Sequence, residues 1–371
     1  SVIRVTRTYY DAFNRPFVVI RNFVGDINSN TPPTFDANQP DKNIGTKTYY
    51  DAAGRAYRAE DLTTGRSDWT CYDIQGRVTK SVTNATVGDP CGTGSHSGNP
   101  DQNLITEYRY DSNNRQIATI APDGKITRTY YDATGRRTLV IGNWVSGNLN
   151  DPNPPAFNSA RPDENVATRY EYDALGRVFK TIQASGSNTE RVGVSCYDGL
   201  GRTVKTVMNP MVADPCVDYV ASAAADEDVI RKMVYDGSGN SIAVISDQSS
   251  VSRITRTYFD GLNRPIIVIS NWVSGNLNDP PPIYSATTPD KNIRQETRYD
   301  AAGQAFEMVD NAGMVIHTDY DLLGRTKATI INYSTTRPAD NETNLKTQTF
   351  YDNSGNVTSK MDANGIVTGY E

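Results

Sequence analysis

A six-residue motif of the form Tyr-Asp-x-x-Gly-Arg recurs throughout the 371 residues and constrains the fold more than any other feature of the sequence. Its first copy is Tyr10-Asp11-Ala12-Phe13-Asn14-Arg15, and eleven near copies follow. A chain with internal repeats folds as an array of similar units, each of which packs on its neighbours. The motif aspartates are Asp11, Asp51, Asp73, Asp111, Asp132, Asp173, Asp198, Asp236, Asp260, Asp300, Asp321 and Asp352.

The spacing of the motifs indicates a longer repeat. Over most of the chain, successive motif aspartates lie alternately about 40 and about 22 residues apart, so long and short connections alternate. The long connections are of two kinds: one has Phe23, Trp144 or Trp272 near its start, and the other contains Cys91, Cys216 or Ala339. The sequence therefore predicts a single continuous repeat array over residues 1–371, with superrepeats at about 1–121, 122–249 and 250–371.

Each motif has the pattern of a β-hairpin tip. The incoming segment alternates in polarity, as in residues 126–131, and a second strand-like segment follows, as in residues 15–20. Asp at the first turn position, with Gly or Asn at the fourth, favours a type I turn that ends in a left-handed residue. We therefore expect an all-β fold, in which antiparallel hairpins wind into a helical or spiral sheet, with an open fibre-like array as one form. Only Val220 to Lys232, which is rich in alanine, is compatible with a short helix.

Charge and hydropathy exclude several classes of partner. The 37 basic and 43 acidic residues are interspersed, so no basic stripe predicts nucleic-acid binding. The longest apolar runs, such as residues 266–269, are too short to span a bilayer. No signal peptide begins at Ser1, and we expect the sequence to be a segment of a longer protein.

The four cysteines form two equally spaced pairs. Cys71 and Cys91 occupy the same places in the first superrepeat as Cys196 and Cys216 do in the second. In the third superrepeat Asp319 and Ala339 replace both, and this joint loss predicts the disulfides Cys71–Cys91 and Cys196–Cys216; free buried thiols are the alternative. Disulfides form in oxidising compartments, so we expect an extracellular or cell-surface protein.

The motif resembles the YD repeat of the Rhs family, which occurs in bacterial Rhs proteins and teneurins. The resemblance covers the whole chain, and clear copies include Tyr50, Asp51, Gly54 and Arg55, and also Tyr131, Asp132, Gly135 and Arg136. It implies a continuous spiralling β-sheet, which in teneurins and bacterial toxins closes into a hollow shell and in toxins encloses a C-terminal effector. The family's closing motif, Asp-Pro-x-Gly-Leu, does not occur in this sequence.

The recurring Tyr, Asp and Arg residues favour a structural role. An isolated hairpin is marginally stable, so neighbouring tips must support each other. We expect the Arg of one copy to lie over the next Tyr ring or to pair with a neighbouring Asp. The alternative is a Tyr ladder that binds sugars, together with the loops that carry Trp144 and Trp272.

The long connections end in a recurring acidic-x-Asn pattern. Oxygen ligands two residues apart on a loop can bind calcium, whereas the simpler interpretation is a turn that returns the chain to a strand. The weak calcium candidates are Asp41, Asn43, Asp163, Asn165, Asp290 and Asn292. No other cofactor is predicted.

The sequence predicts a protein that is not an enzyme, because it contains no nucleophile elbow, phosphate loop or dinucleotide fingerprint. Of the two histidines, His96 lies in a Gly- and Ser-rich segment, and His317 is in an unrelated context. We expect a structural segment of a secreted bacterial surface protein or extracellular fibre, which contacts neighbouring repeats or copies of itself. The alternatives are part of an Rhs-type shell around an effector domain and an adhesin that binds glycans.

Overall fold

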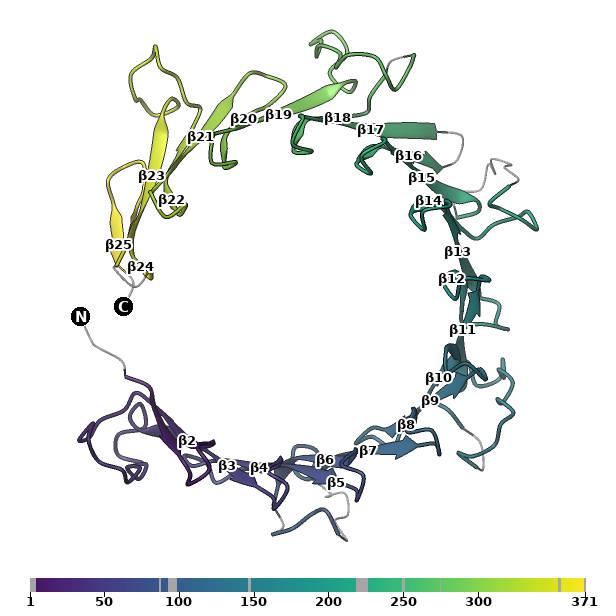
Figure 1. Ribbon diagram of the computed structural model, residues 1–371, viewed down its shortest axis with the longest axis vertical. Coiled ribbons are helices and arrows are strands. Elements are labelled where there is room, and N and C mark those ends of the chain that lie inside the picture. Colours follow the sequence, from purple (N-terminus) through teal and green to yellow (C-terminus); the bar gives the residue numbers. More distant parts are fainter. Residues whose placement is uncertain are drawn as a thin grey trace. The chain divides into compact units, whose positions relative to one another are not determined.

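The computed structural model describes residues 5–86, 88–92, 99–145, 148–217, 226–248, 251–273, 275–352 and 355–369 (Figure 1). These residues form 25 β-strands of one antiparallel sheet, and no helix occurs among them. The predicted all-β array of antiparallel hairpins is confirmed. Within the same residues, no helix has the length and apolar character needed to cross a membrane.

By their internal contacts the residues form two compact units. The first unit comprises Ser1–Glu171 and Thr181–Glu190, and the second comprises Tyr172–Lys180 and Arg191–Glu371. The strands of the first unit are β1 (Arg7–Tyr10), β2 (Pro16–Arg21), β3 (Ile44–Tyr50), β4 (Ala56–Asp61), β5 (Ser67–Tyr72), β6 (Val78–Ala85), β7 (Leu104–Tyr110), β8 (Gln116–Ile120), β9 (Ile126–Tyr131) and β10 (Arg137–Gly142). Both units contribute residues to β11 (Val166–Tyr172) and β12 (Val178–Gln183).

The second unit contains the remaining strands. They are β13 (Arg191–Tyr197), β14 (Thr203–Met208), β15 (Val229–Tyr235), β16 (Ser241–Gln248), β17 (Val251–Phe259), β18 (Pro265–Ser270), β19 (Ile293–Tyr299), β20 (Ala305–Val309), β21 (Val315–Tyr320), β22 (Thr326–Ile331), β23 (Leu345–Tyr351), β24 (Val357–Met361) and β25 (Val367–Gly369).

Within each unit, consecutive strands pair in chain order. In the hairpin of β3 and β4, for example, Thr48 lies opposite Ala59, and the register shifts between Tyr49 and Tyr50. The same shift precedes the tip in the hairpins of β13 and β14 and of β21 and β22. A left-handed residue after a type I turn produces this bulge, so the motif sets the register of each hairpin.

Core clusters lie under the long connections, and those under the first kind of connection recur in each superrepeat. Ile20, Ile141 and Ile269 occupy equivalent strand positions and are 0% exposed. Trp144 packs on Leu139 and Ile141, and Trp272 packs on Ile267 and Ile269. Each such connection therefore folds back over its own strands and removes their apolar side chains from water.

The helix expected within Val220 to Lys232 is wrong in its described part. Residues 226–228 form a turn, and Val229 begins strand β15. Residues 218–225 lie outside the described residues. The described part contains no alanine, and the pairing of β15 with β14 and β16 makes residues 229–232 part of the sheet.

Candidate functional site

The motif forms a hairpin tip of constant geometry. In the tip around Asp132, the Gly135 N–H donates to the Asp132 carbonyl over 3.1 Å, and the Asp132 N–H donates to the Arg136 carbonyl over 2.9 Å. The Asp132 Oδ1 also accepts the N–H groups of Thr134 and Arg136, each at 2.9 Å. The residue at the fourth turn position, counted from the motif aspartate, has a positive φ in every copy, namely Asn14, Gly54, Gly76, Asn114, Gly135, Gly176, Gly201, Gly239, Asn263, Gly303, Gly324 and Gly355. The predicted turn is confirmed.

The motif arginine pairs with the aspartate of its own tip. Arg136 Nε lies 2.7 Å from the other carboxylate oxygen of Asp132, and Arg55 Nη2 lies 2.7 Å from Asp51 Oδ2. In the first copy, Arg15 Nη2 lies 2.6 Å from Asp11 Oδ2. Where the arginine is replaced by Asn240, its amide donates to Asp236 over 2.9 Å. In these tips the aspartate therefore fixes the guanidinium or amide group of its own motif, whereas the Gln304 amide donates to the Gly324 carbonyl of the next tip over 3.1 Å.

The same arginine reaches the next tip along the sheet. The guanidinium carbon of Arg202 lies 4.4 Å from the centre of the Tyr235 ring, and the Tyr235 hydroxyl donates to the Thr203 carbonyl over 2.9 Å. Equivalent contacts between arginine and the next tyrosine join Arg15–Tyr50, Arg55–Tyr72, Arg77–Tyr110, Arg115–Tyr131, Arg177–Tyr197, Arg264–Tyr299 and Arg325–Tyr351. We call this row of contacts within each unit the tip ladder.

The tip ladder also explains why glycine occurs at the fourth position. A Cβ atom added to Gly76, whose φ is 83°, would lie 3.2 Å from Nη1 of Arg55 in the preceding tip. Glycine adopts this positive φ without strain and leaves room for the guanidinium, whereas Asn114, at the same position of another copy, accepts from Arg77 Nη1 over 2.7 Å. The sequence predicted the turn, and the structure adds the contact between tips.

Loss of one tyrosine hydroxyl tests the hydrogen-bonded part of the tip ladder. We expect Tyr235→Phe to lower the free energy of unfolding by about 0.5–1.5 kcal/mol, because the Thr203 carbonyl loses its donor while the ring remains. Tyr10→Phe is the matched control, because Tyr10 is 57% exposed, and its effect should be smaller. Chemical denaturation of both variants measures the difference, and equal losses would contradict the assignment.

The aspartates of the hairpin tips have a lowered pKa, which favours the ionised carboxylate. The backbone N–H of the motif arginine donates to each of these carboxylates, and this hydrogen bond is the main cause that holds their pKa below its usual range. The guanidinium of the same arginine lowers the pKa further. Asp51, Asp132, Asp173, Asp198, Asp260 and Asp321 share this shift.

Acid is therefore expected to destabilise the sheet. A carboxylate whose folded pKa is depressed contributes stability above its unfolded pKa of about 3.9, and this contribution is lost as the pH falls toward the folded value. We expect the melting temperature to fall steeply below about pH 4. Circular dichroism between pH 2 and pH 7 checks this, and Asp198→Asn should make the fall shallower. A melting temperature that is constant down to pH 2.5 would contradict it.

Paired asparagines close the long connections. Asn22 and Asn43 both have positive φ; the Asn22 amide donates to the Asp41 carbonyl over 2.8 Å, and the Asn43 Oδ1 accepts the Val24 N–H over 2.8 Å. The Asn43 N–H returns to the Asn22 carbonyl over 3.0 Å. The same arrangement joins Asn84–Asn103, Asn143–Asn165, Asn209–Asp228, Asn271–Asn292 and Asn332–Asn344.

This closure uses backbone or side-chain oxygens of all six calcium candidates. The side-chain oxygens of Asn43, Asn165 and Asn292 accept backbone N–H groups, and Asp41, Asp163 and Asp290 supply backbone carbonyls while their side chains are exposed. Among the described residues, no three His, Cys, Asp or Glu side chains are grouped to hold a metal ion. The geometry is that of a chain-reversing turn.

Buried arginines anchor the first kind of connection, and sequence reasoning missed them. Arg128 is 6% exposed, and its guanidinium donates to the carbonyls of Leu149 and Ile117, each at 3.0 Å, while it lies 4.4 Å from the Tyr130 ring centre. Arg256 has the same role with Leu277 and Ile242. The available signal was the recurrence of Thr-Arg-Thr-Tyr at residues 6–9, 127–130 and 255–258.

Disulfides attach the second kind of connection to the sheet. The structure joins Cys71 to Cys91 and Cys196 to Cys216, with Cα–Cα distances of 5.4 and 5.5 Å. In each case a lysine of the following strand donates to a carbonyl of the same loop, Lys80 to Pro90 and Lys205 to Pro215. These are the pairings that the shared spacing of the cysteines predicted.

The Trp side chains are not available to a glycan. Trp144 and Trp272 are 4% and 5% exposed and belong to the core clusters. A carbohydrate-binding surface built on the loops that carry them would therefore not include these two indole rings. Motif tyrosines of the tip ladder, such as Tyr235, are also engaged, because a guanidinium covers a ring face and the hydroxyl donates to a backbone carbonyl.

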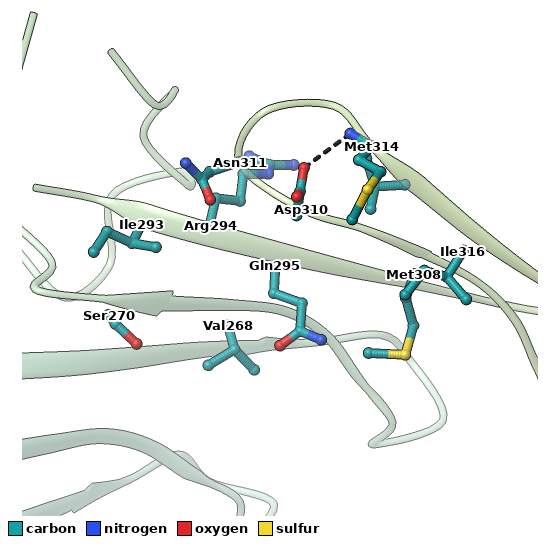
Figure 2. Close-up of a pocket in the computed structure, with 11 residues that line it drawn as sticks. Val268, Ser270, Ile293, Arg294, Gln295, Met308, Asp310, Asn311, Met314 and Ile316 are labelled. Carbon is teal, nitrogen blue, oxygen red and sulfur yellow. Dashed lines mark hydrogen bonds between the residues drawn. The ribbon is translucent and has the colours of Figure 1, made fainter. Parts of the chain in front are cut away.

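A pocket of about 260 Å³ lies on the second unit, on the sheet face opposite the connections (Figure 2). Val268, Gln295 and Met308 point into it from adjacent strands. At its rim, Asp310 accepts the Ala312 and Met314 N–H groups over 2.9 and 2.8 Å, so this carboxylate supports its own turn. The pocket is largely aliphatic and contains no arrangement of acid, base and nucleophile among its lining residues.

Comparison with solved structures identifies proteins with a similar fold. No family model matches the chain, and neither does any curated protein. A solved structure of TcdB2-TccC3 without its hypervariable C-terminal region matches 99% of this chain at 17% identity with a TM-score of 0.51. A second TcdB2-TccC3 structure matches 99% at 16% identity with a TM-score of 0.49, and the Photorhabdus luminescens Tc holotoxin pore matches 95% at 12% identity with a TM-score of 0.41.

The likeness to the first of these structures shows the fold alone. The chain folds like one stretch of the TcdB2-TccC3 polypeptide and spans 18% of its length. It therefore corresponds in extent to a small part of a much longer sheet-forming chain.

Proposed function

We propose that the chain is a non-enzymatic structural segment that forms part of the wall of a larger protein. The tip ladder is the observation that carries this proposal. The Asp, Arg and Tyr side chains that recur in the motif are used to hold tips together, as Asp198, Arg202 and Tyr235 are. Because these polar side chains contact one another and the backbone, the repeat serves to extend a sheet.

Part of an Rhs-type shell is the form of this function that the comparisons favour. A match covers 99% of this chain and 18% of a longer TcdB2-TccC3 chain, and the motif resembles the YD repeat. In that form, the partner would be an enclosed effector domain. The regular superrepeat favours the second form, an open extracellular fibre in which copies of the chain contact each other.

The two disulfides support placement outside the cell. Both cysteine pairs are bonded, and no free cysteine is found in the described chain. Structural disulfides persist in oxidising compartments, so a secreted or surface-exposed protein fits them best.

Electron microscopy of the full-length secreted protein tests the proposal. The shell form predicts discrete hollow particles, and the fibre form predicts filaments with a repeat along their axis. Separate globular domains with no extended sheet wall would contradict both forms. A catalytic activity that is lost on substitution of residues within this segment would contradict the non-enzymatic assignment.

A further inference from the structure

The third superrepeat attaches its second kind of connection without a disulfide. Asp319 and Ala339 stand where the other superrepeats have their cysteines. The connection at residues 332–344, which we call the third clasp, is held by the Tyr333 N–H on the Val315 carbonyl at 2.8 Å and by the Asn332–Asn344 closure. A different side-chain contact therefore takes the place of the covalent bond.

His317 provides that contact. It lies on β21 at the position of Trp69 in the first superrepeat, and its ring stacks on Tyr333 of the third clasp with centroids 4.4 Å apart and planes inclined by 25°. Phe306 packs edge-on against the same ring at 5.9 Å, as Tyr57 packs against Trp69 at 5.4 Å. The aromatic cluster is conserved in place between these superrepeats, but in the third it contains an imidazole.

Carboxylates face both nitrogens of this imidazole. Nδ1 lies 3.2 Å from Glu307 Oε1 on β20, and Nε2 lies 3.2 Å from Asp319 Oδ1 on its own strand. A neutral imidazole has one N–H donor and one lone pair, whereas an ionised carboxylate only accepts. In the neutral form, one lone pair must therefore face a carboxylate oxygen. Only the protonated ring can donate to both oxygens.

Arginines on β19 pair with the glutamates beside the ring, and the other neighbours of the ring are apolar or aromatic. Arg298 on β19 donates to Glu307 over 2.8 Å and to Glu296 over 3.2 Å, and Arg294 lies 3.0 Å from Glu296. Strand β22 places the apolar Ile330 opposite His317, and the third clasp contributes the Tyr333 ring. Histidine is the side chain that ordinarily changes charge between about pH 5 and pH 8, and His317 is the histidine of this cluster.

We propose that the third clasp is a pH-responsive attachment that protonation of His317 tightens. When the ring is protonated, the imidazolium donates to Glu307 and Asp319, and its positive charge lies against the Tyr333 ring. When the ring loses its proton as the pH rises, one hydrogen bond and the positive charge are lost. The third clasp therefore opens more often. The tightening requires both carboxylates in their ionised form, because only an ionised carboxylate accepts from both N–H groups of the ring without competing as a donor.

Amide hydrogen exchange on the full chain at pH 5.5 and pH 7.5, corrected for intrinsic exchange, measures this opening. We expect the N–H groups of Tyr333, Ser334 and Asn344 to be protected about tenfold more at pH 5.5, as the loss of one charged hydrogen bond implies. Residues 209–217 are the internal control, because a disulfide closes that connection, and their protection should be equal at both pH values.

Two variants separate this histidine from the other one. His317→Gln should abolish the pH difference, and His96→Gln, at a position outside the described residues, should leave it intact. Should His317→Gln fail to fold, nuclear magnetic resonance of His96→Gln replaces it: the ring signals of His317 and Tyr333 should titrate together. Equal protection at both pH values, a pH difference that survives in His317→Gln, or Tyr333 signals that ignore the titration would overturn the proposal.

Discussion

Replacement of Trp272 by alanine is expected to lower the free energy of unfolding by about 3–5 kcal/mol, the usual cost of removing a buried indole. Trp272 is 5% exposed and packs on Ile267 and Ile269, and its backbone N–H donates to the Ile254 carbonyl over 2.8 Å. The side chain thus joins the long connection to the strands beneath it. Denaturation by urea, followed by circular dichroism, measures the loss.

Trp272→Phe is the matched control. Phe23 stands at the equivalent position in the first superrepeat, so phenylalanine should retain most of the stability. A loss of less than about 1 kcal/mol for the alanine variant would contradict the burial of the connection's anchor, since a cavity of this size costs more. A stable alanine variant that loses glycan binding would instead support the adhesin alternative.

Removal of one disulfide is expected to cost about 3 kcal/mol, because the bond closes a loop of 20 residues in the unfolded chain. The double variant Cys196→Ser, Cys216→Ser tests this and leaves no odd thiol. Its effect should be confined to the second superrepeat, and exchange protection around residues 84–86, beside the other disulfide, should not change.

Mass spectrometry of the secreted protein without reduction is the companion measurement. It should find the Cys71–Cys91 and Cys196–Cys216 links and no free thiol. Four free thiols in secreted material would contradict both the pairing and the proposed compartment.

The hairpin tips could be predicted from the sequence because their determinants are local. Asp and a Gly or Asn three residues later, as in Asp51 and Gly54, fix a type I turn and its left-handed residue without reference to the rest of the fold. The strands on either side followed from alternation. The cysteine pairing was accessible for a different reason: both members vanish together in one superrepeat.

Contacts between distant segments could not be predicted in the same way. The sequence left open whether each arginine pairs with an aspartate or covers a tyrosine, and Arg202 does both, in its own tip and the next. The Asn22–Asn43 closure joins residues at opposite ends of a connection, and periodicity carries no information about it. The sequence also did not reveal that the tryptophan-bearing loops fold back on the sheet and bury their rings.

A double-mutant cycle between Arg202 and Tyr235 tests most directly whether successive tips support each other. Arg202→Ala, Tyr235→Leu and the double variant give the coupling free energy, because the loss of the Asp198–Arg202 pair cancels in the cycle. The tip ladder predicts a favourable coupling of about 0.5–1 kcal/mol. Arg202 and Tyr299 belong to tips that are not in contact, so this control pair should give no coupling free energy. A coupling for Arg202 and Tyr235 as small as that control would contradict the account.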